Sequence, residues 1–153
     1  MLLLLEDTKI EDKTMTKEDE ISRNLALIEY YKEQLANLDM QMQYLQVAMA
    51  DYQKAKISIE HLEKTEDATE ILVPLGSGIF VNASAKDTSK VLLDIGAGVV
   101  AEKNTNDAIK KIDERIENLE KNQEKILSMA QQLQNEANEL AQKTQKLVNE
   151  SKQ

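Results

Sequence analysis

Residues 71–81 read ILVPLGSGIFV, and they align without a gap on residues 91–101, which read VLLDIGAGVVA. Each copy is an apolar run, a Gly-x-Gly break and a second apolar run. A short Gly-containing break between two such runs predicts a β-hairpin, so the middle of the chain carries the same hairpin motif twice. The expected turn glycines are Gly76, Gly78, Gly96 and Gly98.

The region before this repeat contains no Gly and no Pro, and it carries a heptad pattern. Ile21 begins a series of apolar residues that recurs every seven positions. A second series, three positions further on, is regular from Tyr31 onward, and Asn24 interrupts only its start. This alternating spacing of three and four residues predicts the seam of a coiled coil.

Both ends of this first helix carry signals in the sequence. Thr16 followed by Asp19 is an N-cap pattern just ahead of the first apolar residue of the stripe. The heptad pattern fails at Lys56 and Glu63. We therefore expect the helix to leave its partner near these two residues and to end by about residue 66.

The region after the repeat carries a second heptad pattern. Ile112 begins a series that stays apolar without exception as far as Leu147, while the companion series from Ile109 becomes smaller and more polar toward the C-terminus. Either Asn104 or Thr105 can cap this helix. Small or polar residues opposite large ones suit an antiparallel pair of helices better than a tight self-zipper.

The expected fold is therefore α+β but mainly α, a long antiparallel two-helix coiled coil joined by two β-hairpins. Each expected helix has about 45 residues and therefore extends about 65–70 Å at 1.5 Å per residue. Because the two helices are equal in length, the chain can fold back completely. The expected parts are a disordered N-terminus or extension at 1–17 and a single domain at 18–150, made of a helix at 18–66, hairpins at 69–102 and a helix at 105–149.

The strands predict oligomerisation. An isolated hairpin is marginal in water, and unpaired apolar strand edges pair with other strands. Pro74 cannot donate a ladder hydrogen bond, so it places its strand at an edge or in a special position. The expected oligomerisation residues are Ile71, Val73, Leu75, Ile79, Phe80, Val81, Val91, Leu93, Ile95, Val99 and Val100.

Composition excludes several classes of function. The net charge is −9, and no basic stripe is present, so we expect no nucleic-acid partner. The chain contains no Cys, which excludes disulfides and Cys-zinc sites. Residues 1–5 read MLLLL but lack the basic region and cleavage site of a signal peptide. We interpret them as an extension or as the result of a wrongly assigned translation start, with Met15 as the alternative start. The functional alternative is an apolar tail that adheres to other molecules. A cytoplasmic location without a membrane partner is expected.

Two weaker patterns favour no catalytic chemistry. Residues 96–101, GAGVVA, match a dinucleotide fingerprint, but the following residues predict a strand rather than the helix that would hold a pyrophosphate. His61 is the only histidine, and its acidic neighbours form a common surface pattern rather than a metal site. We expect no metal, no cofactor and no enzymatic activity.

The stretches Val73–Val81 and Asp94–Val99, placed between two long helices, closely resemble the alpha-class subunit of prefoldin. The resemblance covers residues 18–150, and the doubled hairpin points to the alpha class because beta-class subunits carry one hairpin. It implies a hexamer of two alpha and four beta subunits, a double β-barrel platform and six coiled-coil tentacles. It also implies that unfolded chains are held at the tentacle tips and passed to a group II chaperonin without nucleotide hydrolysis.

The expected tip joins the start of the first helix to the end of the second. Leu25 and Leu27 lie off the heptad seam, so they are the strongest candidates for exposed contacts. Other candidates lie on the seam, where they can be explained by the coiled-coil core alone rather than by substrate binding. These are Ile21, Ile28, Leu140 and Leu147. The runner-up function is a self-assembling alpha-like paralogue that forms a homo-oligomer or filament, and a nucleotide-binding enzyme is a distant third. The candidate substrate-binding residues are Ile21, Leu25, Leu27, Ile28, Leu140, Leu147 and Val148.

Overall fold

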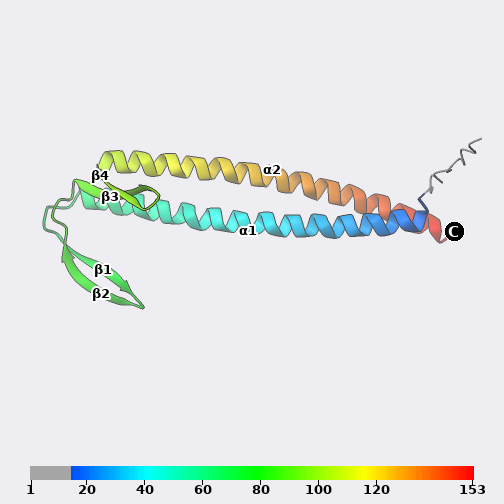
Figure 1. Cartoon of the computed structure of the whole chain (residues 1–153), viewed down its shortest axis with the longest axis horizontal. Helices are drawn as coiled ribbons and strands as arrows, with labels where there is room; N and C mark the ends of the chain where they lie inside the picture. The colour runs from blue at the N-terminus through cyan, green and yellow to red at the C-terminus, as the bar shows by residue number, and fades with distance from the viewer. Residues whose placement is uncertain (1–14) are drawn as a thin grey trace, which may run out of the picture. The chain divides into compact units, whose positions relative to one another are not determined.

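The computed structural model describes residues 15–153 as a helix, four strands and a second helix (Figure 1). This order confirms the predicted fold class. The expected disordered terminus or extension at 1–17 falls almost entirely on residues outside the described range. The elements are α1 (Lys17–Glu63), β1 (Glu70–Gly76), β2 (Ile79–Ser84), β3 (Lys90–Gly96), β4 (Val99–Asn104) and α2 (Thr105–Ser151).

The described residues group into two units. We call residues 15–38 and 129–153 the terminal unit, and residues 39–128 the hairpin unit. The terminal unit holds the first part of α1 and the last part of α2. The hairpin unit holds the remainder of both helices and all four strands.

Both helices begin with the caps that the sequence offers. At α1, the Thr16 hydroxyl accepts a hydrogen bond from the Asp19 backbone N–H at 3.1 Å, and the Thr16 N–H donates to the Asp19 carboxylate at 3.3 Å. This reciprocal pair satisfies two donors at the helix start. At α2, the cap is Asn104, whose side-chain oxygen accepts from the Asp107 N–H at 2.8 Å. The choice between Asn104 and Thr105 is thereby resolved.

The two hairpins connect to the helices differently. Asn104 is the last residue of β4 and Thr105 is the first of α2, so no linker residue separates them. At the other junction, residues 64–69 lie between α1 and β1. The first helix therefore ends at Glu63, slightly before the expected position near residue 66.

The hairpins are separate two-stranded antiparallel sheets, β1 with β2 and β3 with β4. In the second, Gly96 pairs with Val99, so Ala97 and Gly98 alone form the turn. Their φ angles are 51° and 74°. Positive φ at both central residues is the geometry of the two-residue type I′ turn, which matches the twist of the flanking strands. The first hairpin repeats this arrangement, which explains the Gly-x-Gly repeat.

Within the hairpin unit, α1 and α2 stay in contact at a position where the sequence predicted that they separate. The Lys56 ammonium lies 2.7 Å from the Asp113 carboxylate of α2. Next to this pair on α2, Ala108 is fully buried and Ile112 is 2% exposed. The prediction of separation near Lys56 was wrong, because the aliphatic stem of a lysine can cover apolar surface while its ammonium reaches an acid.

A buried threonine ties the linker between the hairpins to the segment between α1 and β1. The Thr88 hydroxyl donates to the Thr65 carbonyl at 3.1 Å, and the Thr88 N–H donates to the Asp67 carboxylate at 3.0 Å. Thr88 is 6% exposed, so its polar groups are buried and paired. Over residues 15–153, neither helix contains a segment both long and apolar enough to cross a membrane.

Candidate functional site

The predicted tip residues come together in the terminal unit. The blue start of α1 lies beside the red end of α2 (Figure 1), and two ion pairs join them. Lys17 lies 3.4 Å from Glu150, and Lys143 lies 2.8 Å from Glu20. These pairs are largely exposed, so each contributes at most about 1 kcal/mol. The two ion pairs nevertheless show that α1 and α2 run antiparallel within this unit.

The candidate residues differ in exposure according to their heptad position. Leu25 is 53% exposed and Leu27 is 37% exposed. An α-helix turns about 100° per residue, so residues 25 and 27 flank the seam on opposite sides. The remaining candidates are half-buried along the helix pair: Ile21, Ile28, Leu140, Leu147 and Val148.

Leu27 also lines a groove between the two helices. The groove has a volume of about 270 Å³. Burial raises the pKa of the Tyr31 hydroxyl, and the neighbouring Glu136 carboxylate raises it further. Both effects favour the neutral phenol, which can donate a hydrogen bond. We call this the terminal groove, lined by Leu27, Tyr31, Glu136, Glu139, Leu140 and Lys143.

Polar residues are buried in the helix pair of the terminal unit. Asn24 is 6% exposed, and its side-chain nitrogen has no hydrogen-bond partner among the described residues. Thr144 is 5% exposed, but its hydroxyl donates to the Leu140 carbonyl at 2.7 Å. A buried donor without a partner costs about 1–3 kcal/mol. The seam is therefore locally weak at Asn24, close to the exposed Leu25.

The expected oligomerisation residues of the hairpins are largely uncovered in the single chain. Of these residues, only Val91 and Leu93 on β3 are half-buried. Each two-stranded sheet also leaves the outer edges of both strands open. The exposed members are Ile71, Val73, Leu75, Ile79, Phe80, Val81, Ile95, Val99 and Val100.

Arg115 connects the second hairpin to both helices, a role that the sequence did not predict. Its guanidinium donates a hydrogen bond to the Asp94 backbone carbonyl at 2.6 Å. Its Cζ atom also lies 5.7 Å from the centre of the Tyr52 ring, within range of a cation–π interaction. Arg115 therefore fixes β3 against α2, and the only signal in the sequence was a cation close to the helix seam.

The weaker patterns carry no site chemistry in the described residues. Gly96 and Gly98 belong to a hairpin turn, and the residues that follow form β4 rather than a helix. A pyrophosphate would therefore meet no helix N-terminus there. His61 is exposed, and no group of three or more His, Asp or Glu side chains within residues 15–153 is placed to hold a metal ion.

Comparisons with known proteins agree on one family. The family model described as prefoldin subunit matches residues 31–150. The prefoldin subunit alpha of Archaeoglobus fulgidus is 34% identical over 128 residues, which cover 84% of this chain and 93% of that protein.

Two solved structures share the fold. A cryo-EM structure of filamentous PFD from Methanocaldococcus jannaschii has a TM-score of 0.57 at 23% identity, covering 82% of this chain and 98% of that one. The crystal structure of the prefoldin beta subunit from Thermococcus strain KS-1 has a TM-score of 0.56 at 17% identity, covering 86% and 95%. With two hairpins between two long helices and an alpha subunit as a relative, the chain belongs to the prefoldin family of chaperone subunits, in its alpha class.

Proposed function

We propose that this chain is the alpha subunit of a cytoplasmic holdase that captures unfolded polypeptides without nucleotide hydrolysis. Two copies assemble with four beta-class subunits through their hairpins, and the complex passes its clients to a group II chaperonin. Family membership supports the chaperone role. The observation that carries the capture mechanism is the exposure of Leu25 and Leu27 on both sides of the terminal seam.

Exposed apolar residues suit capture because non-native chains display apolar side chains that folded proteins bury. Leu25 and Leu27 lie beside a seam weakened by Asn24, so the apolar surface there can grow as the helices move apart. Charged residues around the terminal groove, such as Glu139 and Lys143, keep the unoccupied surface soluble.

The test replaces Leu25 and Leu27 together with Ser in the assembled complex. Capture of a chemically denatured client should fall about thirtyfold, because two contact side chains contribute roughly 1 kcal/mol each when buried. The complex mass in native mass spectrometry should stay unchanged. The matched control is Ile57→Ser, which removes an equally exposed apolar side chain, 53% exposed, from the hairpin unit. Equal capture by the double variant and the control would refute the assignment to the terminal unit.

A second candidate function follows from the open strand edges. Exposed apolar strands can pair with further copies of the same chain, and a protein of this fold is described as filamentous. Self-assembly into a homo-oligomer or filament is therefore the alternative. Native mass spectrometry of the tagged chain from its own source decides between them, because two copies with four smaller subunits indicate the heterohexamer and a ladder of this chain alone indicates self-assembly.

A further inference from the structure

The part of α1 in the hairpin unit contains an unusually long uncharged stretch. Residues 40–50 include no Lys, Arg, Asp or Glu, although charged residues make up 31% of the chain. Within the stretch, Met40 is 56% exposed, Tyr44 is 77% exposed and Val47 is 63% exposed. Their spacing of four and three residues places them on one side of the helix. We call these three residues the mid-helix apolar face.

These residues lie off the heptad seam, so coiled-coil packing does not explain them. The seam of this segment uses other residues, such as Leu45, which is half-buried. A large apolar side chain on a solvent-facing helix surface has no role in stabilising the helix pair. Three of them in succession, with no charge between them, form a surface that favours an apolar partner.

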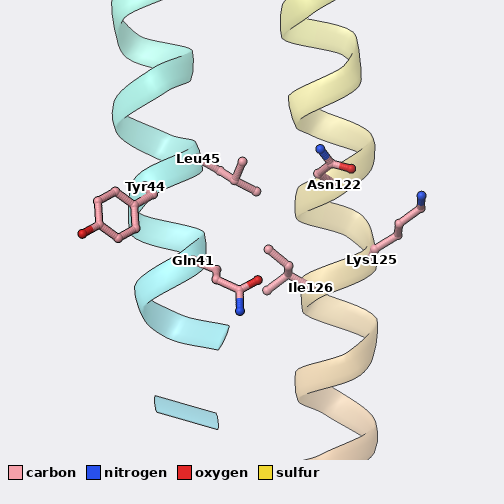
Figure 2. A pocket seen from close by; sticks show the side chains of 6 residues that line it. All are labelled: Gln41, Tyr44, Leu45, Asn122, Lys125 and Ile126. Atoms are coloured by element: carbon pink, nitrogen blue, oxygen red, sulfur yellow. The ribbon is translucent and has the colours of Figure 1, made fainter. Parts of the chain in front are cut away.

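Two hollows adjoin this face and share Tyr44. One, of about 270 Å³, is lined by Met40, Gln43, Tyr44 and Val47. The other has a volume of about 390 Å³ and lies between the helices. Figure 2 shows Leu45 and Ile126 pointing into the space between the helices, while the Tyr44 ring lies on the side of α1 away from α2. The lining residues are Gln41, Tyr44, Leu45, Asn122, Lys125 and Ile126.

The side chains that line the second hollow indicate which partner fits. Gln41 and Asn122 are exposed amides, and each can both donate and accept hydrogen bonds. An extended polypeptide has backbone N–H and C=O groups that need such partners, whereas a folded helix has already paired its own. A membrane surface would instead require a cluster of cations, and Lys125 is the one cation among these lining residues.

We propose that the mid-helix apolar face and the adjoining hollow form a second contact site for extended apolar segments of a captured non-native polypeptide. The inference rests on the proposed function, because it assumes first capture by the terminal unit. A client held at one site reaches the second at a high effective concentration, so the second contact slows release more than it changes initial binding.

The experiment compares release of a denatured full-length client from three assembled complexes. They carry the wild-type chain, the triple variant Met40→Gln, Tyr44→Gln and Val47→Gln, and the control Ile57→Gln. All four positions are exposed and helical, and Gln is a good helix former, so the helix should remain intact. We expect the triple variant to release its client about tenfold faster than wild type, because three apolar contacts are lost. Release from the control should match wild type.

A photo-crosslinking benzophenone residue provides the second measurement. Placed at position 44 it should join to the client, and placed at position 57 it should not. Equal release rates in the triple variant and the control, with wild-type capture intact, overturn the inference alone. A smaller assembled mass in the triple variant also overturns it, since the face would then be a subunit interface. Failure of the wild-type complex to capture any client instead overturns the proposed function.

Discussion

The terminal unit and the hairpin unit differ in one of the polar side chains that they bury. In the hairpin unit, the buried Thr88 pairs its hydroxyl and its N–H with Thr65 and Asp67. In the terminal unit, the equally buried Asn24 leaves its side-chain nitrogen without a partner among the described residues. A satisfied buried polar group fixes one arrangement, whereas an unsatisfied one lowers stability. The hairpin unit thus fixes its linkers through a paired buried group, whereas the helix pair of the terminal unit carries an unpaired one.

The largest expected effect comes from breaking the hairpin unit at a turn. Gly98→Val places a β-branched side chain at a φ of 74°, where a residue other than Gly costs about 1–2 kcal/mol. We expect the β3–β4 hairpin to lose its turn and the complex mass in native mass spectrometry to fall. A Cβ atom at this position would meet no neighbouring atom within 4 Å, so the effect comes from backbone conformation alone.

Gly98→Asn provides the matched control for this change. Asn tolerates a positive φ, so assembly should survive this substitution. If both variants assemble normally, a regular turn in the second hairpin is not required for assembly of the complex.

A smaller effect is expected from removing the weakness of the terminal unit. Asn24→Leu replaces a buried unsatisfied amide with an apolar side chain, so the free energy of unfolding should rise by about 1–2 kcal/mol. A denaturant melt of the chain followed by circular dichroism measures this change. Thr144→Val is the control, because the Thr144 hydroxyl already has a partner in the Leu140 carbonyl. A destabilised Asn24→Leu variant would mean that the amide is paired after all.

The smallest effect concerns the linker between the hairpins. Hydrogen bonds from the Ser89 hydroxyl and backbone N–H lower the pKa of the Asp87 carboxyl. A carboxyl whose pKa is lowered on folding contributes stability above its unfolded-state pKa, and this contribution is lost as the pH falls through the folded-state pKa. Protection of the Ser89 amide from hydrogen exchange should therefore fall below about pH 4. In Asp87→Asn this pH dependence should be absent, and an unchanged profile would contradict the assignment.

The sequence predicted the parts of this fold that depend on local rules. The Gly-x-Gly repeat indicated both hairpins because type I′ turns require positive φ, and the Thr16 and Asn104 caps follow from side-chain hydrogen bonding alone. The heptad pattern also separated Leu25 and Leu27 from the seam, and the structure exposes both.

What the sequence could not predict depends on contacts between distant residues. Lys56 broke the heptad pattern, yet it remains in the helix pair because Asp113 lies 2.7 Å away on α2. The role of Arg115 depends on a carbonyl of β3. The hollow beside Tyr44 exists only because Ile126 and Asn122 face that part of α1. Such pairings depend on how α1 and α2 are aligned with each other. The heptad pattern of one helix does not determine that alignment.

The second hairpin is joined to α2 without any intervening residue. With Asn104 ending the strand and Thr105 starting the helix, a rotation of this part of α2 about its axis must turn the plane of β4 with it. Arg115 adds a second attachment at β3, so torque is transmitted at two points. At the other junction, residues 64–69 separate α1 from β1, and Thr88 holds Thr65 and Asp67 of this segment by hydrogen bonds. Motion of α2 should therefore reach β4 directly, whereas motion of α1 reaches β1 only through this hydrogen-bonded segment.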